Sequence, residues 1–305
     1  MRPHRSILTV PGSSPRFMAK AAGSSADVIM LDLEDSVADS QRAAARRAIV
    51  KALHELQWGT KVRTVRVSAT STPWFYRDLI TVVEGAGEHI DAIVLPKVTC
   101  AGDVYMLDTL LTQIEAVMQL RLRIGIEAQI ETAPAMRDVD AIAQASPRLI
   151  ALVFGPGDFA AAMGMPLLSI GADGAGYPGH IWHAHLSRML LAARAVGVLA
   201  IDGPYAVLGD AEGLRHSAGA SRRLGYDGKW AIHPAQIEMI NAVFSPTVAE
   251  IEQATRIVAA YEAATAAGSG AMRSGGEMLD AASVAMARRL LSRRVDQGEP
   301  PTGGG

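Results

Sequence analysis

The hydrophobic positions fall into short, nearly continuous apolar runs separated by longer amphipathic stretches. The intervening stretches repeat apolar residues at i, i+3 and i+4, which predicts helices such as Ser40–Leu56, Asp103–Gln119, Ala133–Ala145 and Ile181–Ala195. Apolar strands that alternate with helices favour a parallel sheet covered on both faces, and eight such units favour a closed (β/α)8 TIM barrel over an open doubly wound sheet. The runs expected to form strands are Ile7–Val10, Val28–Leu33, Thr64–Val67, Ala92–Leu95, Arg123–Ile130, Leu149–Phe154, Leu199–Asp202 and Lys229–Ile232.

The pattern changes after the eighth predicted strand. Two further helices are predicted, Thr247–Ala264 and Glu277–Leu291, which is more helix than eight units need. We therefore expect a catalytic barrel domain over residues 1–245 and a C-terminal helical extension over residues 246–296. The remaining residues, 297–305, are rich in glycine and proline and are expected to form a disordered tail.

Composition and charge narrow the class of function. The 305 residues carry 29 Lys and Arg against 31 Asp and Glu, so the chain lacks the basic excess that binding to nucleic acid requires. The single cysteine, Cys100, excludes an internal disulfide and a multi-cysteine metal site. No stretch reaches 18 uninterrupted apolar residues, and the first apolar run is too short for a signal peptide. We expect a cytoplasmic protein that binds neither nucleic acid nor membranes.

Ionisable residues gather where the predicted strands end. In a barrel, the carboxyl ends of the strands form the face that carries the chemistry. Glu131 and Asp158 follow adjacent strands, and two carboxylates that meet there repel each other unless a cation or a proton lies between them. An oxygen-only pair suits Mg²⁺, and no Cys or His cluster indicates zinc. The alternative roles are a loop cap and a salt bridge.

The acids after the second strand have two interpretations. Asp32, Glu34 and Asp35 would accept hydrogen bonds from metal-bound water as a second shell of the metal site. Asp35 taken alone equally suits a helix cap.

Three basic residues also allow two interpretations each. Arg66 ends the third strand, where its guanidinium would bind a substrate carboxylate or balance the neighbouring acids. Lys97 follows the fourth strand and fits either a Schiff-base aldolase or a structural charge partner for the acids. His233 precedes Pro234 and would act as an acid/base group or fix a turn.

Several motifs occur together and in order along the chain, and as a set they are specific. On these motifs the chain resembles the malyl-CoA/β-methylmalyl-CoA lyases of the citrate lyase β-subunit-like group, in the HpcH/HpaI aldolase superfamily, over roughly residues 4–292. The motifs are Val10-Pro-Gly12, Leu31-Asp-Leu-Glu-Asp-Ser-Val37, Val65-Arg-Val67, Leu95-Pro-Lys-Val98, Ile130-Glu-Thr-Ala133, Gly228-Lys-Trp-Ala-Ile-His-Pro234, Thr72-Pro-Trp-Phe-Tyr-Arg-Asp78 and Thr99-Cys-Ala-Gly-Asp-Val-Tyr105.

The resemblance implies a Mg²⁺-dependent, reversible aldol cleavage, with Mn²⁺ as an alternative ion. Malyl-CoA would give acetyl-CoA and glyoxylate, and β-methylmalyl-CoA would give propionyl-CoA and glyoxylate. Glu131 and Asp158 match the metal ligands, and Arg66 matches the residue that polarises the glyoxylate oxygens and balances enolate charge. A metal-dependent aldolase needs no Schiff base, which returns Lys97 to its structural role. Backbone groups of Gly157 and Asp158 match those that bind the substrate carboxylate. The residues that match coenzyme A contacts are Thr9, Lys20, Ile232 and His233.

The resemblance also assigns a role to the C-terminal extension. Asp280, in the motif Gly276-Glu-Met-Leu-Asp280-Ala-Ala282, matches the residue that transfers the proton at the acetyl carbon. Read without the resemblance, Asp280 is an ordinary helix-start carboxylate. The extension would reach over a neighbouring protomer, so Asp280 would act in trans in a homo-oligomer, a trimer or a hexamer. Ser68 and Ser14 depart from the family's Asn and Arg, and Arg16 lies two residues from Ser14.

Three other functions stay open on these motifs. A malyl-CoA thioesterase would direct water at the thioester on the same scaffold. A citramalyl-CoA or citryl-CoA lyase would differ by small changes in the pocket. A non-catalytic binding protein, or a subunit that needs partners, would not need all of Arg66, Glu131, Asp158 and Asp280.

Overall fold

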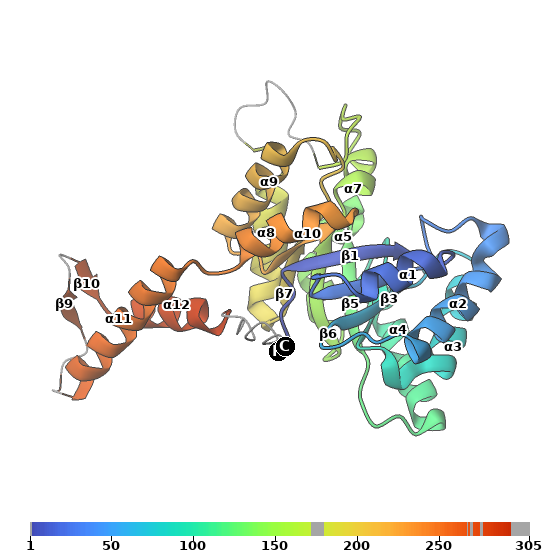
Figure 1. Cartoon of the computed structure of the whole chain (residues 1–305), viewed down its shortest axis with the longest axis horizontal. Coiled ribbons are helices and arrows are strands. Elements are labelled where there is room, and N and C mark those ends of the chain that lie inside the picture. The colour runs from blue at the N-terminus through green and yellow to red at the C-terminus, as the bar shows by residue number, and fades with distance from the viewer. Residues whose placement is uncertain (1, 172–179, 267, 269–270, 275–276, 294–305) are drawn as a thin grey trace, which may run out of the picture. The chain divides into compact units, whose positions relative to one another are not determined.

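The structure is a computed structural model that describes residues 2–171, 180–266, 268, 271–274 and 277–293. The chain divides into two compact units, Met1–Phe244 and Ser245–Gly305 (Figure 1). The expected disordered tail, 297–305, lies outside the described residues. Over the described residues, none of the helices combines the length and apolar character needed to span a membrane.

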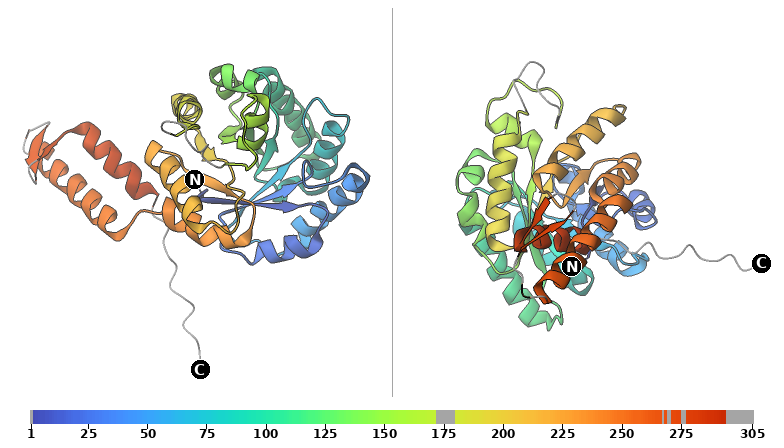
Figure 2. Two further views of the ribbon diagram at one scale, coloured as in Figure 1. Left: turned by 90° about the horizontal axis from the view of Figure 1, so that it is seen from above. Right: turned by 90° about the vertical axis from the view of Figure 1, so that its left-hand side faces the viewer.

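The first unit is a closed barrel of eight parallel strands that pair in chain order, with the eighth pairing back to the first (Figure 2). This confirms the predicted (β/α)8 fold. Three predicted strands have the observed bounds, and the other five differ by one to two residues at an end. The strands are β1 (Ser6–Pro11), β2 (Val28–Asp32), β3 (Val62–Arg66), β4 (Ala92–Leu95), β5 (Gly125–Ile130), β6 (Leu149–Phe154), β7 (Leu199–Asp202) and β8 (Gly228–Ala231).

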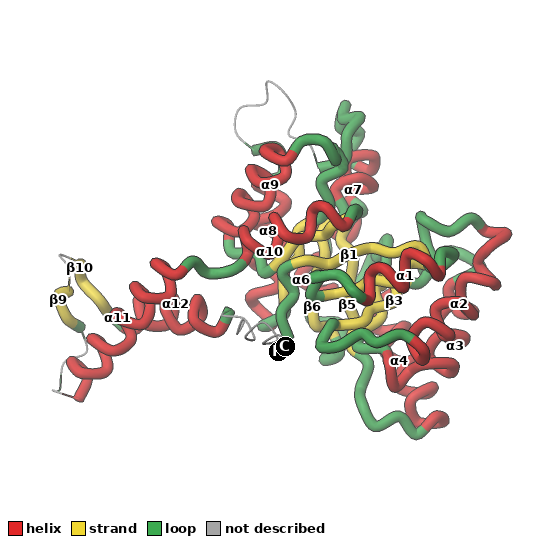
Figure 3. Tube along the Cα trace, in the orientation of Figure 1, coloured by secondary structure: helices red, strands yellow, loops and turns green. Residues whose placement is uncertain are grey.

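Helices surround the barrel, and Figure 3 shows them as red tube around the yellow strands. Short 3-10 helices η1 (Asp39–Gln41), η2 (Gly87–His89) and η3 (Pro234–Gln236) join some of them to their neighbours. The helices of this unit are α1 (Pro15–Ala22), α2 (Arg42–Glu55), α3 (Phe75–Ala86), α4 (Ala101–Met118), α5 (Ala133–Arg137), α6 (Val139–Ala143), α7 (Pro156–Ala162), α8 (His183–Val196), α9 (Ala211–Leu224) and α10 (Ile237–Phe244).

Two separate apolar layers explain why the strands read as continuous hydrophobic runs. Alternate residues of a strand point to opposite faces, so a barrel strand buries one set inside the barrel and the other under the helices. The larger layer includes Ile29, Leu31, Leu79 and Leu107. The smaller layer consists of Ile7, Val28, Met30, Val62, Val94, Ala151, Val153, Ile201 and Trp230.

One predicted helix of the barrel is two helices in the structure. The stretch Ala133–Ala145 forms α5 and α6, which meet at Asp138 with φ −104° and ψ 20°. The N–H of Asp138 donates to the carbonyl of Pro134, and its own carbonyl accepts from Ile142. The chain therefore bends between two short helices while the hydrogen bonds continue across the bend.

The second unit contains α11 (Val248–Ala266), β9 (Met272–Ser274), β10 (Glu277–Leu279) and α12 (Ala281–Ser292). The predicted helix Glu277–Leu291 is wrong at its start, because β10 pairs with β9 in an antiparallel hairpin. Helix α12 begins only after Asp280, whose carboxylate accepts the N–H of Ser283 at 2.9 Å and caps the helix.

Candidate active site

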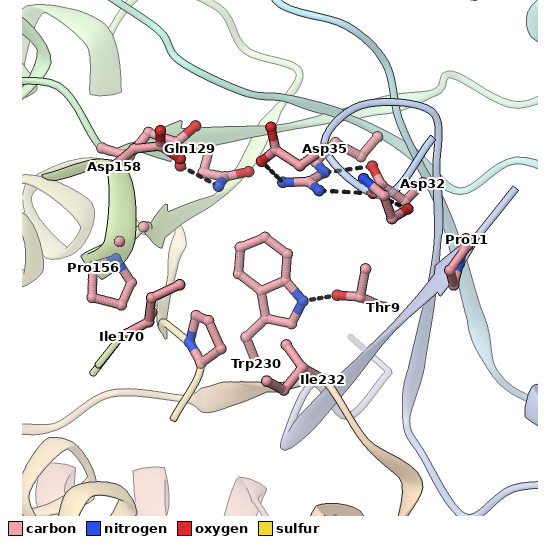
Figure 4. Close-up of a pocket in the computed structure, with 16 residues that line it drawn as sticks. Thr9, Pro11, Asp32, Asp35, Gln129, Pro156, Asp158, Ile170, Trp230 and Ile232 are labelled. Carbon is pink, nitrogen blue, oxygen red and sulfur yellow. Dashed lines mark hydrogen bonds and ion pairs between the residues drawn. The ribbon is translucent and has the colours of Figure 1, made fainter. Parts of the chain in front are cut away.

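A cavity of about 370 Å³ opens at the carboxyl ends of the barrel strands (Figure 4). The strands β1, β2, β3, β5, β6, β7 and β8 all contribute to it, through residues near their carboxyl ends or in the loops that follow them, as expected for the chemical face of this fold. Its walls are polar on the side of β2, β3 and β5 and apolar on the side of β7 and β8. The lining residues are Thr9, Pro11, Asp32, Asp35, Ser36, Arg66, Gln129, Glu131, Gly155, Pro156, Gly157, Asp158, Ile170, Pro204, Trp230 and Ile232.

Glu131 follows β5 and is almost fully buried, with 1% of its surface exposed. Its Oε1 accepts the backbone N–H of Lys97 at 2.7 Å, and its Oε2 accepts the side-chain amide of Gln129. Burial raises the pKa of Glu131 to about 8, and the negative charges of Glu34 and Asp158 add to the rise. A bound cation would stabilise the ionised form of a carboxylate in this position.

Gln129 was not predicted as a site residue. It precedes Glu131 by two positions, so strand alternation places both side chains on the same face of β5. That alternation was the available signal in the sequence. The amide nitrogen of Gln129 orients Glu131, and its buried Oε1 has no hydrogen-bond partner within the described residues.

Asp158 lies in the first turn of α7, where acidic residues are favoured, and its side chain is about half exposed. Gly155, three residues before Asp158, packs directly against Glu131. A Cβ on Gly155 would lie 2.2 Å from Oε2 of Glu131 and 2.5 Å from its Cβ. The structure thus brings the two predicted metal-ligand carboxylates to one side of the cavity, and the missing side chain at position 155 lets them approach.

Arg66 forms a two-point ion pair with Asp32 inside the barrel mouth. Its Nε lies 2.6 Å from Oδ1 of Asp32, and its Nη2 lies 2.8 Å from Oδ2. Burial alone would raise the pKa of Asp32, but the charge and hydrogen bonds of Arg66, with the hydroxyl of Ser36, lower it below its usual value. The remaining Nη1 of Arg66 lies 3.1 Å from Glu34, and the guanidinium carbon lies 5.2 Å from the centre of the Trp230 ring. Asp32 is therefore a partner of Arg66.

Glu34 and Asp35 share the ammonium group of Lys97. Lys97 Nζ lies 2.8 Å from Oε1 of Glu34 and 2.9 Å from Oδ1 of Asp35. Burial raises the pKa of Glu34 to about 7, and the charge of Arg66 opposes that rise. For Lys97, burial opposes the charged form, but its hydrogen bonds to both acids raise the pKa above the ordinary value. An ammonium so stabilised is a charge partner and a poor Schiff-base nucleophile, in line with the second interpretation of Lys97.

The residues matched to coenzyme A contacts divide into two groups. Thr9 and Ile232 line the cavity, and the hydroxyl of Thr9 accepts a hydrogen bond from the indole of Trp230. Lys20 is exposed in the last turn of α1 and His233 is exposed after β8, and neither lines the cavity. His233 Nδ1 accepts the N–H of Ala235 at 3.2 Å, which is the turn-fixing role.

The two departures from the family motifs lie outside the cavity lining. Ser68 is fully buried, and its hydroxyl donates to Asp78 at 2.5 Å and accepts from Arg42 at 2.6 Å. Ser14 caps α1 by accepting the N–H of Phe17. Both serines therefore act on the fold around the site.

Asp280 belongs to the second unit. Its side chain is exposed, and hydrogen bonds from the backbone and hydroxyl of Ser283 lower its pKa below the usual value. The helix-capping role expected from the residues alone is present.

A model of the HpcH/HpaI aldolase/citrate lyase family matches residues 5–234, three quarters of the chain. The chain belongs to this family. This family member is 43% identical over 299 residues to L-malyl-CoA/β-methylmalyl-CoA lyase from Rhodobacter capsulatus, covering 95% of this chain and 94% of the relative. It is also 39% identical over 292 residues to (3S)-malyl-CoA thioesterase from Cereibacter sphaeroides, with the same coverage. The resemblance inferred from the motifs is confirmed.

A solved structure agrees with the fold over the whole chain. CitE from Mycobacterium tuberculosis, in complex with magnesium, acetoacetate and coenzyme A, has a TM-score of 0.75 and 29% identity. The match covers 96% of this chain and 98% of that one. The match to this structure therefore extends beyond residues 5–234 into the second unit.

Proposed function

We propose that this protein is a Mg²⁺-dependent carbon–carbon lyase that cleaves malyl-CoA to acetyl-CoA and glyoxylate, and β-methylmalyl-CoA to propionyl-CoA and glyoxylate. The observation that carries the proposal is the joining of Glu131, Asp158 and Arg66 in one cavity of a chain 43% identical to such a lyase. Coenzyme A thioesters are the substrates of that relative by name.

The donor set fits Mg²⁺. Glu131 and Asp158 would hold the ion through carboxylate oxygens, the ligand type that Mg²⁺ prefers, and the solvent-facing cavity leaves room for water and substrate oxygens. Mn²⁺ accepts the same ligands. When bound, the ion would supply Lewis-acid polarisation of the aldehyde and carboxylate oxygens of glyoxylate.

The side chains of the protein would divide the remaining work. Arg66, fixed by Asp32, presents its positive charge where the glyoxylate oxygen and the enolate oxygen become negative, and backbone groups at Gly157 and Asp158 bind the substrate carboxylate. In the condensing direction Asp280 removes a proton from the acyl carbon next to the thioester, that carbon bonds to the aldehyde carbon as the C=O π bond breaks, and the resulting alkoxide takes up a proton from water in the open cavity. In cleavage the hydroxyl group gives its proton to water, the carbon–carbon bond breaks as the aldehyde forms, and Asp280 returns a proton to the acyl carbon.

The decisive experiment separates the lyase from the thioesterase suggested by the second relative. Purified protein is incubated with malyl-CoA and Mg²⁺, with an EDTA control, and glyoxylate and free thiol are measured in parallel. Glyoxylate without thiol is expected. Thiol without glyoxylate would establish a thioesterase. In a parallel comparison of substrates, faster cleavage of citramalyl-CoA or citryl-CoA would identify a citramalyl-CoA or citryl-CoA lyase instead.

We also propose that Asp280 acts in trans within a homo-oligomer, a trimer or a hexamer, in the cytoplasm. The exposed carboxylate of Asp280 in a second compact unit supports this proposal. Asp158→Asn and Asp280→Asn chains are each expected to be inactive, and oligomers that contain both chains are expected to regain activity. Mixed oligomers without activity would place Asp280 in the same chain's site or outside catalysis. Cell fractionation tests the location.

A further inference from the structure

Lys97 joins the two acidic halves of the site. It follows Pro96 at the end of β4 with a φ of 49°, a left-handed backbone conformation that is unfavourable for a residue with a side chain. Among the described residues other than glycine, only Gln119, which ends a helix, shares a positive φ. Conformations of this kind persist where surrounding contacts impose them, and they cluster at functional sites.

The backbone and the side chain of Lys97 contact different acids. The N–H, directed by the left-handed turn, donates to Oε1 of Glu131 at 2.7 Å. The ammonium group bonds to Glu34 and Asp35, and it also lies 4.0 Å from Oδ1 of Asp158. The N–H of Lys97 thus orients Glu131, one proposed metal ligand. The ammonium group of Lys97 is a cation beside Asp158, the other proposed ligand.

The charges around the cavity are unequal. Arg66 is bound at two points by Asp32, so its charge is largely committed to that buried pair. Through Nη1, Arg66 also lies 3.1 Å from Glu34 and 3.5 Å from Asp35, but among the described residues only Lys97 places a cationic group within 4.0 Å of Asp158, and a third of the Lys97 side chain is exposed to solvent. A divalent ion that binds Glu131 and Asp158 would have to do so beside this fixed positive charge. The charged residues are Asp32, Glu34, Asp35, Glu131 and Asp158 against Arg66 and Lys97.

We propose that the ammonium group of Lys97 is a built-in counter-ion that competes with a divalent cation for the carboxylates of the site, while the backbone of Lys97 holds Glu131 ready for that cation. The inference rests on the proposed metal site and goes beyond it, because it assigns opposite effects on metal affinity to two groups of one residue.

Removing the ammonium group while keeping the N–H should tighten metal binding. Lys97→Met keeps an unbranched side chain one atom shorter than lysine. Lys97→Gly adopts a positive φ without strain and protects against a folding failure of the first variant. By Coulomb's law, a unit charge and a double charge about 6 Å apart in a water-like dielectric change a binding constant about tenfold. We expect both variants to bind Mn²⁺ about tenfold more tightly than the native protein, and Lys97→Arg to bind like the native protein.

The test titrates full-length protein with Mn²⁺ and measures free Mn²⁺ by its electron paramagnetic resonance signal. This readout does not depend on turnover. Titrations at 20 mM and 500 mM salt test the electrostatic origin, because screening should shrink the tenfold difference. Lys51→Met is the matched control: it removes an exposed lysine of α2 that pairs only with Glu55 among the described residues, and its affinity should stay native.

The outcomes separate the two proposals. If Glu131→Gln binds Mn²⁺ as well as the native protein does, the proposed metal site is wrong. If Glu131→Gln loses binding but the Lys97 variants that fold bind Mn²⁺ no more tightly than the native protein, the metal site stands and the counter-ion inference is overturned. Equal tightening in Lys51→Met would also overturn it, because the effect would then reflect net charge alone.

Discussion

Replacing Gly155 with alanine should displace Glu131 and thereby weaken metal binding at the proposed site. Gly155 has φ −108° and ψ 86°, which alanine adopts, so the backbone conformation does not oppose the change. The new methyl group would lie 2.2 Å from Oε2 and 2.5 Å from Cβ of Glu131. Real contacts of a Cβ are essentially never under 3.0 Å, so one of the two strand ends must move.

The size of the effect follows from how Glu131 is held. Its carboxylate lies between the N–H of Lys97 and the amide of Gln129, so no free rotation relieves the contact. Overpacking of this kind costs about 1–3 kcal/mol of folding free energy. Disturbing the residues that orient a metal ligand typically costs about 10–100-fold in metal affinity or activity, and we expect Gly155→Ala to fall in that range.

The assay compares Gly155→Ala with Gly102→Ala. The control adds the same methyl group in α4, where the nearest atom is Sγ of Cys100 at an ordinary 3.4 Å. Urea unfolding gives the folding free energy, and Mn²⁺ titration and malyl-CoA cleavage give affinity and rate. Native affinity and rate in Gly155→Ala would refute the argument that the absence of a side chain at position 155 shapes the site.

Three further predictions test other parts of the protein. Arg66→Met leaves the carboxylate of Asp32 buried without its partner and should lower the free energy of unfolding in urea by about 3–5 kcal/mol at pH 7, with exposed Arg47→Met as control; an unchanged value would contradict the buried pair. Burial raises the pKa of Glu127 to about 7 in the folded protein, so the stability of the native protein should fall as the pH rises from 4.5 to 7. Glu127→Gln should therefore be more stable than the native protein by about 3 kcal/mol at pH 8.5 and by under about 1 kcal/mol at pH 5. A stability difference that does not change with pH would reject this prediction. Asp280→Asn should lower turnover by at least about 100-fold with native Mn²⁺ affinity, and a normal rate would exclude it from proton transfer.

The barrel could be predicted because its strands are short and buried on both faces. Such strands read as apolar runs between amphipathic helices, and eight of them close in order. The hairpin of β9 and β10 could not be predicted in this way, because each strand has three residues and its stability depends on pairing. The capping pair Asp280 and Ser283 was the signal that would have moved the helix start to Ala281.

The sequence predicts which residues lie in the site better than it predicts which side chains pair with one another there. The order of the strands brought Glu131 and Asp158 to one side of the cavity, as expected for adjacent strand ends. The two-point pairing of Asp32 with Arg66 depends on side-chain geometry that spacing does not encode. The left-handed turn at Lys97 was equally hidden, because lysine carries no local preference for it.

Glu127 in β5 and Glu131 just after it show how depth in the barrel decides which positive partner a carboxylate can take. Glu127 and Glu131 are four residues apart on one face of the strand, and both have a raised pKa. For Glu127 the cause is burial alone, and Nε2 of His4 lies 3.9 Å from its Oε1. Glu131 faces the solvent-connected cavity, and the nearby charge of Asp158 adds to the rise in its pKa. A proton can neutralise either carboxylate, whereas only Glu131 faces the solvent-connected cavity that a hydrated divalent ion can enter, which is why the proposed metal site uses Glu131 and not Glu127.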